Sequence, residues 1–454
     1  MNELLNISPI DGRYHEKTKE LSNYFSEFAL IKYRTIVEIK WLLFLLDKKI
    51  IDEKINDDEK KDILNIIHNF NLEDAKQVKE IENTTKHDVK AIEYFLQEKF
   101  KKIKLERLIP FIHITLTSED INNTSYNLMI KDGLKYYLDN LHNLIIKLDE
   151  LSIQYKDIPM LSHTHGQNAS PTTVGKEFKI FSYRLESIIK IINNLKLRSK
   201  FSGAVGNYNC HIVAFPNIDW INITKEFINS LDLEYNPLTT QIESHDILCI
   251  LLSNIKVLNN IIKDLNSDMW LYISRNYFKE MKKDNEVGSS VMPHKVNPIN
   301  HENSMANIEL SNGLIDALVN NLSISRMQRD LSDSSKLRNL GVIFSHSLIS
   351  IKETLTGLNK IVVNEAYLKE ELDNHYEVLT EAIQTVLRKN KVDNAYELLK
   401  ELSRGKELNK EELHKFIKKL EINNDDKERL LNLTPSNYIG LCKKIVENNN
   451  KKYD

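Results

Sequence analysis

The run from Gly288 to Pro298, GSSVMPHKVNP, combines residue types that suit chemistry better than packing. Two adjacent serines follow the glycine, and a lysine stands six residues after the first of them. A serine hydroxyl is a weak base unless backbone N–H groups and a nearby cation stabilise its oxyanion. A glycine-started loop that carries Lys295 would supply both to Ser289. The alternative is a flexible connector, but a connector gains nothing from adjacent serines and a fixed lysine.

A second polar segment, from Ser162 to Gln167, carries two histidines two residues apart. Such spacing can hold a metal, but the chain has neither an HExxH pattern nor clustered cysteines, so we expect no metal site. A lone histidine in a loop is more often a surface residue than a catalyst. The serine loop elsewhere in the chain favours an acid or base role here. Ser170 and Pro171, which follow, predict a helix N-cap and the first helical residue.

Two further polar segments stand at expected helix starts. Thr85 and Asp88 have the spacing of a capping box, and Thr117 and Asp120 repeat it before Ile121. Capping alone explains an isolated motif of this kind. A helix N-terminus also offers N–H groups and the positive end of the helix dipole to an anion. Both interpretations can hold together.

A cluster of arginines and serines follows the serine loop. Its members are Arg326, Arg329, Ser334, Ser335 and Arg338. The planar fork of arginine and the hydroxyl of serine both suit phosphate oxygens. The cluster is therefore a candidate phosphate site, and the alternative is a solvated helix face.

Long helices must position these segments. Gly (12) and Pro (9) are scarce, and apolar residues recur at three- and four-residue steps. The clearest stripe runs from Leu248 to Met269, and others cover 130–151, 174–197 and 308–322. Strand-like alternation is nearly absent. The pattern predicts an all-α fold with a central bundle of long, roughly parallel helices.

We expect three domains. An N-terminal helical domain would cover 1–110, the long-helix bundle with the serine loop 111–348, and a C-terminal helical domain 349–454. No low-complexity linker marks these boundaries.

Composition excludes several classes of protein. The net charge is −3, from 62 basic and 65 acidic residues, so no global field favours nucleic acid or a membrane surface. Cys210, Cys249 and Cys442 lie far apart without metal-type spacing, which favours a reducing compartment. The apolar runs are too short to span a bilayer, and the N-terminus lacks a signal peptide. We therefore expect a soluble cytoplasmic protein.

The run from Gly288 to Pro298 resembles the GSSxMPxKxNP signature of the fumarase/aspartase superfamily. Other segments narrow the likeness to the adenylosuccinate lyase family, in the branch typified by enterobacterial enzymes. They are SPIDGRY at 8–14, TTKHDVK at 84–90, TSEDINN at 117–123, GAVGNYN at 203–209 and TPSNYIG at 434–440. The likeness therefore covers nearly the whole chain, including the cluster from Arg326 to Arg338.

The resemblance implies an all-α, three-domain subunit of a homotetramer, whose core combines the long helices of four chains. Each active site would draw on three subunits. It also implies cleavage of adenylosuccinate to AMP and fumarate, and of the succinyl-aminoimidazole-carboxamide ribotide (SAICAR) of purine synthesis. No metal or organic cofactor is implied, and neither a nucleic-acid nor a membrane partner.

The family pattern implies a role for each matching residue. Ser289 would be the general base, and His165 the general acid that protonates the leaving nitrogen. Glu302 would orient His165 and raise its basicity. Lys295 and Asn297 would hold the succinyl carboxylate as negative charge builds on it.

The remaining candidates would bind the substrate. Hydrogen bonds to the carboxylate would come from Ser290, Thr117, Ser118 and Thr164. The phosphate and ribose would be held by Arg13, Tyr14, His87, Arg329, Ser334 and Arg338. The nucleotide and succinyl portions would contact Asp88 and Gln241, and the predicted substrate-binding set is completed by Lys86 and Asn303.

The chain departs from the family pattern at two places beside His165. Asn168 stands where related chains often have proline, and His163 where they often have arginine. These departures bear on the stiffness and the local charge of that segment.

Alternatives to this function remain. Another lyase of the superfamily, chiefly argininosuccinate lyase, is disfavoured by the arginine and serine cluster, because only a nucleotide needs a phosphate site. A catalytically silent helical scaffold is disfavoured because Ser289, Lys295, Glu302 and His165 are all present. A simple helical interaction module leaves every polar segment unexplained.

Overall fold

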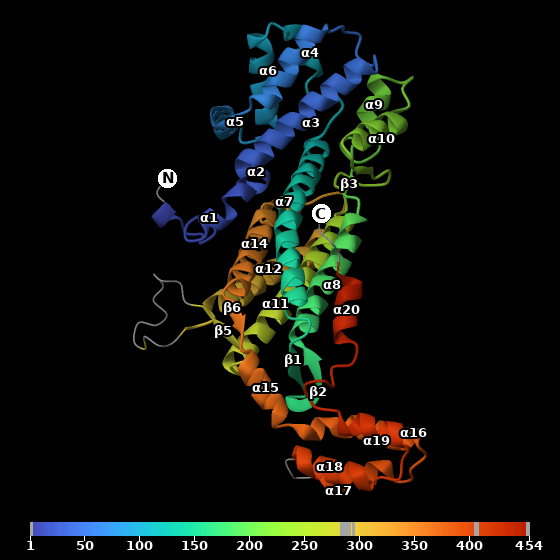
Figure 1. The fold of residues 1–454 in the computed structure, drawn as a ribbon. Coiled ribbons are helices and arrows are strands. Elements are labelled where there is room, and N and C mark those ends of the chain that lie inside the picture. The colour runs from blue at the N-terminus through green and yellow to red at the C-terminus, as the bar shows by residue number, and fades with distance from the viewer. Residues whose placement is uncertain (1–2, 282–291, 293–295, 404–407, 451–454) are drawn as a thin grey trace. The chain divides into compact units, whose positions relative to one another are not determined.

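The computed structural model describes residues 3–281, 292, 296–403 and 408–450. Within these ranges the chain consists of helices, with three small two-stranded sheets beside them (Figure 1). The predicted all-α class is confirmed. None of the described helices is both long and apolar enough to cross a membrane.

Long helices carry the predicted apolar stripes. They are α7 (Ser118–Gln154), α8 (Val174–Asn193), α11 (Asp246–Ser274), α12 (Ile299–Leu322) and α14 (Leu340–Leu358). The stripe on α11 is at most 5% exposed at each of its positions, which are Leu248, Leu251, Ile255, Leu258, Ile262, Leu265 and Met269. The stripe expected to reach Leu197 ends at Asn193. It ends early because the carbonyl of Leu197 already accepts a hydrogen bond from Glu234 (2.9 Å) beside a short parallel sheet.

The chain divides into two compact units. The first comprises residues 1–141, 188–260 and 306–352. In it, Trp41 of α3 packs edge-on against Phe201 and Phe227, each at a ring-centroid distance of 4.9 Å. Its other helices are η1 (Glu3–Leu5), α1 (His15–Thr18), η2 (Lys19–Leu21), α2 (Ser22–Phe25), α3 (Glu27–Asp47), α4 (Asp57–His68), α5 (Leu72–Thr85), α6 (Asp88–Lys102), η3 (Glu106–Phe111), α9 (Asn209–Ala214), α10 (Trp220–Ser230) and α13 (Ser332–Leu337). Its strands are β3 (Arg198–Ser199) and β4 (Glu234–Tyr235).

The second unit comprises residues 142–187, 261–305 and 353–454. Its strands are β1 (Pro159–Thr164), β2 (Gln167–Thr173), β5 (Phe278–Glu280) and β6 (Ile361–Val363). Its shorter helices are α15 (Glu365–Asp373), η4 (Tyr376–Leu379), α16 (Thr380–Lys389), α17 (Ala395–Ser403), α18 (Lys410–Lys419), α19 (Asn424–Leu431) and α20 (Cys442–Asn449). Leu387, Leu413 and Ile417 belong to one buried core shared by α16, α18 and their neighbours.

The boundaries between the two units fall inside the long helices, for example at 141/142 in α7 and 260/261 in α11. The units therefore do not follow the order of the sequence. The three-domain division at 110/111 and 348/349 stays a prediction.

One predicted capping motif is confirmed and one is wrong. α7 begins at Ser118, and the N–H of Thr117 donates to Asp120 Oδ2 at 2.8 Å, which is one of the two hydrogen bonds of a capping box. Thr85, in contrast, ends α5. Lys86 follows in the left-handed conformation (φ 56°), and His87 caps α6. The left-handed residue ends one helix before the next can start, so the cap falls two residues later than expected.

The expected helix start at Ser170 and Pro171 is also wrong. Both residues lie in β2, which pairs antiparallel with β1 from Pro159 to Thr173, and α8 begins at Val174. Short local patterns did not reveal this hairpin, because its stability depends on pairing across the turn.

Candidate functional site

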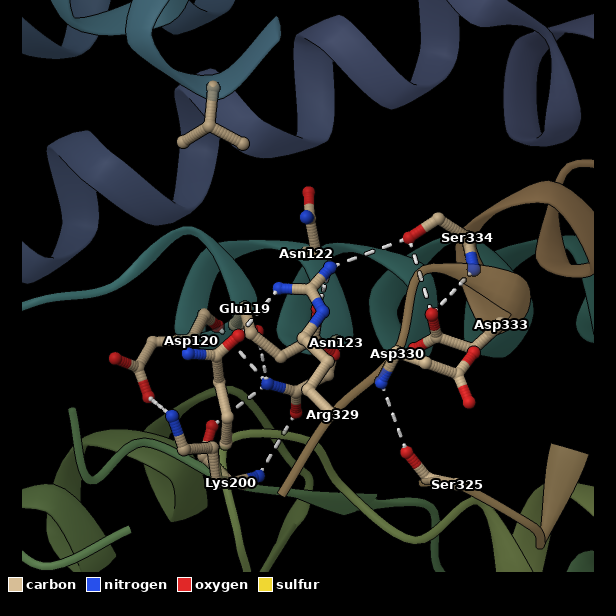
Figure 2. A network of polar contacts seen from close by, with 12 residues as sticks. Glu119, Asp120, Asn122, Asn123, Lys200, Ser325, Arg329, Asp330, Asp333 and Ser334 are labelled. Carbon is tan, nitrogen blue, oxygen red and sulfur yellow. Dashed lines mark hydrogen bonds and ion pairs between the residues drawn. The ribbon is translucent and has the colours of Figure 1, made fainter. Parts of the chain in front are cut away.

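At the start of α7, the neighbouring carboxylates of Glu119 and Asp120 face different partners (Figure 2). Asp120 is fully buried, and its bond to the N–H of Thr117 holds the first turn of the helix. Thr117 and Ser118 are half-buried. Their hydroxyls therefore stand where the N-terminus of a long helix favours an anion.

A buried ion pair ties this helix start to the segment after β3. Lys200 Nζ lies 2.7 Å from Asp120 Oδ1, and neither side chain is exposed. The same oxygen accepts hydrogen bonds from the N–H groups of Ser202 (2.9 Å) and Gly203 (3.3 Å). Asn123 accepts from the N–H of Lys200 at 3.0 Å. The carboxylate thus has several partners, which offset the cost of burying it.

Three predicted substrate-binding residues meet beside the segment between α12 and α13. Arg329 donates to Gln241 Oε1 at 3.0 Å and to Ser334 Oγ at 3.5 Å. Gln241 donates to the carbonyl of Ala204 at 2.8 Å. A cavity of about 520 Å³ lies against this group, lined by Gln241 and residues 327–331. Its volume falls within the usual range of small-molecule sites.

A buried charged cluster lies behind Arg329. Glu119 Oε2 is 3.6 Å from the guanidinium, and its side chain is 3% exposed. His245 stands between Asp333 (3.6 Å) and Glu243 (3.9 Å). Burial lowers the pKa of His245, but the surrounding carboxylates outweigh it and raise the pKa above its ordinary value. Burial raises the pKa of Glu119 to about 7, against the opposing charge of Arg329.

A second group of polar residues surrounds Arg338. Its guanidinium pairs with Glu27 at 2.6 Å and with Asp88 at 3.5 Å. Asp88 also pairs at 2.7 Å with Arg34, a side chain only 3% exposed, and Arg34 donates to Asn122 at 2.9 Å. Burial raises the pKa of Asp88, but Arg34 and Arg338 bring it below its ordinary value. Asp88 and Arg338, predicted separately, are therefore neighbours.

Four other predicted residues lie elsewhere in the first unit. Arg13 and Tyr14 precede α1, with the guanidinium 6.0 Å from the centre of the tyrosine ring. Lys86 and His87 lie between α5 and α6 and are exposed. His87 accepts a hydrogen bond from the N–H of Lys90 at 3.1 Å, so part of its imidazole serves the helix cap.

In the second unit, His165 occupies the tip of the hairpin. Thr164 pairs with Gln167, which leaves His165 and Gly166 as a two-residue turn with positive φ values of 54° and 72°. Both conformations match a type I′ turn. Thr164 and His165 are exposed. The turn therefore presents the imidazole at the surface of this unit.

The two departures from the family pattern make contacts that support this hairpin. His163 Nε2 lies 2.7 Å from an Arg275 guanidinium nitrogen, and burial and Arg275 both hold the pKa of His163 below its ordinary value. Asn168 Nδ2 lies 3.1 Å from His375 Nδ1. In this chain the hairpin is thus held by side chains from outside it.

The start of α12 carries the remaining described candidates. Asn297 and Asn303 are half-buried, and Glu302 is exposed. Glu302 Oε1 accepts a hydrogen bond from Trp270 Nε1 at 3.1 Å, and its predicted pairing with His165 stays a prediction. Three predicted residues lie outside the described residues: Ser289, Ser290 and Lys295. Within the described ranges, no group of three or more His, Cys, Asp or Glu side chains is arranged to hold a metal ion.

Comparison with known proteins gives the family. A family model described as Lyase matches residues 12–309, and one described as Adenylosuccinate lyase C-terminal matches residues 325–439. Adenylosuccinate lyase of Buchnera aphidicola subsp. Schizaphis graminum is 49% identical over 452 residues, which cover 98% of this chain and 99% of that protein. The chain belongs to the adenylosuccinate lyase family.

Further relatives agree with membership of the adenylosuccinate lyase family. The adenylosuccinate lyase of Escherichia coli K12 is 45% identical over 451 residues, covering 98% of this chain and 99% of that one. A solved structure of a fumarate lyase from Mesorhizobium sp. BNC1 matches with a TM-score of 0.75 at 18% identity, over 96% of this chain and 97% of that chain. The structural likeness shows the fold, and the resemblance drawn from the motifs is confirmed.

For this member of the adenylosuccinate lyase family, the motifs gave the predicted substrate-binding residues but did not reveal the buried side chains that pair with them. Arg34 and Lys200 are buried cations paired with motif carboxylates. A single arginine or lysine in an otherwise ordinary segment carries no spacing signal. Glu119 lies inside a quoted motif, yet only the fold reveals that it faces Arg329.

Proposed function

We propose that this chain eliminates fumarate from adenylosuccinate, giving AMP, and from SAICAR, giving the aminoimidazole-carboxamide ribotide AICAR. Membership of the adenylosuccinate lyase family supports the reaction. The observation that supports a nucleotide substrate is the pairing of Arg329 with Gln241 at one cavity, with Ser334 hydrogen-bonded to the same guanidinium. A nucleotide needs such a phosphate-binding group, and argininosuccinate does not.

The proposed chemistry begins with removal of a proton from the carbon beside a carboxylate. The resulting aci-carboxylate carries extra negative charge, which the site must stabilise before the C–N bond breaks. We assign Ser289 as the base, and Lys295 with Asn297 as the groups that hold this charge. His165 then protonates the nitrogen that leaves with the nucleotide, and Glu302 orients the imidazole.

Several local features support these roles. The exposed turn at His165 makes its imidazole accessible to a substrate. The start of α7 supports carboxylate binding by Thr117 and Ser118, and we assign Ser290 and Thr164 to the same carboxylate. Phosphate and ribose binding is assigned to Arg13, Tyr14, His87, Arg329, Ser334 and Arg338. The other contacts are assigned to Lys86, Asp88, Gln241 and Asn303.

We also propose a homotetramer with shared sites. On α11, Ile250, Val257 and Leu271 are 45%, 41% and 48% exposed. They are spaced by multiples of seven residues, as on a helix that packs against another helix. An exposed apolar stripe of this kind supports association with further chains. We expect the enzyme to work in the cytoplasm, and the free thiols of Cys210, Cys249 and Cys442 suit a reducing compartment.

The first experiment measures fumarate release by the purified protein given adenylosuccinate, with argininosuccinate in a parallel reaction. We expect release from adenylosuccinate alone. Release from argininosuccinate alone would mean that the arginine and serine cluster has been misinterpreted. No release from either, by an intact tetramer, would favour the catalytically silent scaffold.

The acid and base assignments have a separate test. We expect His165→Ala and Ser289→Ala each to lower turnover by at least ~10²-fold with the tetramer intact, because each removes one proton-transfer group. Turnover would be measured on adenylosuccinate, and oligomeric state by sedimentation. Near-normal turnover in either variant would remove that residue from its role.

A further inference from the structure

Glu119 is a buried carboxylate next to the proposed phosphate site, and no role has been assigned to it. Its Oε2 lies 3.6 Å from an Arg329 guanidinium nitrogen, and its side chain is 3% exposed. Arg329 is 20% exposed, so one side of the guanidinium faces this carboxylate and another reaches solvent. A phosphate bound at Arg329 would therefore share the cation with Glu119.

Charged groups from several elements face Glu119 (Figure 2). Arg329 and Asp333 come from the segment between α12 and α13 and from α13, His245 from the segment before α11, and Lys200 from the segment after β3. Lys200 is already paired with Asp120, and His245 lies between Asp333 and Glu243. When every group is ionised, four carboxylates face three cations. In that fully ionised state the cluster carries excess negative charge before any phosphate arrives.

Compared with Asp120 and Asp333, Glu119 is the carboxyl group that takes up a proton most readily. Asp120 accepts hydrogen bonds from three backbone N–H groups besides pairing with Lys200. Asp333 accepts from the N–H of Ser334 at 2.7 Å and faces His245. Glu119 has instead one ion pair at 3.6 Å, longer than an ordinary hydrogen bond. Its charged form is the least stabilised of these.

A nucleotide phosphate carries nearly two negative charges at neutral pH. Placed against Arg329, it raises the cost of a second anion in the same water-poor region, because like charges disfavour the ionised form of a carboxyl group. We propose that Glu119 takes up a proton from solvent when the phosphate binds at Arg329, and returns it when the product leaves. The guanidinium then exchanges a carboxylate for a phosphate. This inference rests on the proposed function.

The titration range of Glu119 agrees with this role. Burial raises its pKa to about 7, so the free site holds a mixture of protonated and ionised forms near neutral pH. Above that pH the ionised form competes with phosphate for Arg329. Nucleotide affinity should therefore fall as pH rises through 7 and above, and product release should become easier.

The first test uses the unaltered enzyme. Calorimetric titration with AMP at about pH 8, in buffers of different ionisation enthalpy, counts the protons taken up on binding; the AMP phosphate is already a dianion there. We expect a net uptake that approaches, and does not exceed, one proton per site. AMP binding without proton uptake would overturn the proposal.

The second test uses Glu119→Gln, which keeps the shape and removes the charge. At about pH 8 we expect it to bind AMP on the order of threefold to tenfold more tightly than the unaltered enzyme, without proton uptake. The KM for adenylosuccinate should lose its rise above neutral pH. Weaker AMP binding, or unchanged proton uptake, would contradict the proposal. If this variant does not fold, the proton count on the unaltered enzyme still decides.

Glu38→Gln is the matched control. Glu38 is a buried carboxylate of the same unit, but it pairs with His113 at 2.5 Å rather than with Arg329. We expect this variant to keep the proton uptake. An enzyme that neither cleaves adenylosuccinate nor binds AMP would defeat the proposed function and this inference with it. Cleavage and AMP binding without proton uptake would defeat the inference alone.

Discussion

At the scale of single residues, Arg329 is the proposed phosphate-binding cation that lines the cavity. Its guanidinium donates to Gln241 and Ser334 and remains partly exposed. Removing it takes a charged donor away from the phosphate of AMP, whereas fumarate has no phosphate. We expect Arg329→Ala to weaken AMP binding roughly 10- to 100-fold and fumarate binding far less, as measured by product inhibition.

A control for that variant is Arg198→Ala. Arg198 is a partly exposed arginine of the same unit that pairs with Glu234 at 2.8 Å, so its removal should leave both inhibition constants unchanged. If Arg329→Ala weakened AMP and fumarate equally, the phosphate assignment would be wrong.

The pair Asp120 and Lys200 belongs to the same scale but concerns stability. Both side chains are fully buried, so Asp120→Asn or Lys200→Met leaves one charge without its partner. We expect each single change to lower the free energy of unfolding by about 3–5 kcal/mol, and the double change to cost less than their sum. Denaturant unfolding of the intact protein measures this, and strict additivity would argue against a coupled pair.

Asp149 and Lys179 offer a comparison, since they pair at 2.6 Å and are only 4% and 5% exposed. Asp149→Asn should reduce stability in the same way. Asp120 also fixes the helix start that carries Thr117, so only Asp120→Asn should raise the KM for adenylosuccinate.

At the scale of elements, the hairpin from Pro159 to Thr173 decides where His165 stands. Its two-residue turn needs positive φ at both positions, and Gly166 supplies the second at φ 72°. A Cβ at Gly166 would meet no atom within 4 Å, so backbone conformation and not crowding sets the cost of a side chain there. The conformation of the turn therefore depends on having glycine at position 166.

We expect Gly166→Ala to destabilise the turn by about 1 kcal/mol. Because a small displacement of a catalytic group is costly, turnover should fall on the order of tenfold or more. Gly313→Ala is the comparison: Gly313 lies within α12, with open space around its Cβ. There alanine should raise the thermal midpoint slightly, because it favours the helix. Equal turnover in the two variants would show that the turn does not position His165.

At the scale of the whole molecule, the exposed stripe on α11 gives a test of the proposed tetramer and of its role in activity. Val257, between Ile250 and Leu271, is the central position of this stripe. We expect Val257→Lys to shift the tetramer toward smaller species in sedimentation and to lower activity with it, because burying an unpaired charge between helices is costly. Leu72→Lys, at an exposed leucine of α5, should change neither. An intact tetramer in Val257→Lys would exclude α11 from the interface.

The sequence by itself determined the helical architecture and the family. The apolar stripe of α11, the capping box at Thr117 and the motif at Gly288 to Pro298 all depend on residues within a few turns of one another. Local signals of this kind are set by the backbone period and by side chains near in sequence. They can therefore be recognised in the sequence before the tertiary structure is known.

Tertiary structure alone decided which side chains meet. Arg34 reaches Asp88 and Asn122 across 54 and 88 residues of chain, and Arg329 reaches Gln241 across 88. The hairpin at His165 and the approach of Glu119 to Arg329 are likewise results of packing. Such contacts depend on how distant helices pack and on which buried charges then need partners. No spacing along the chain encodes that information.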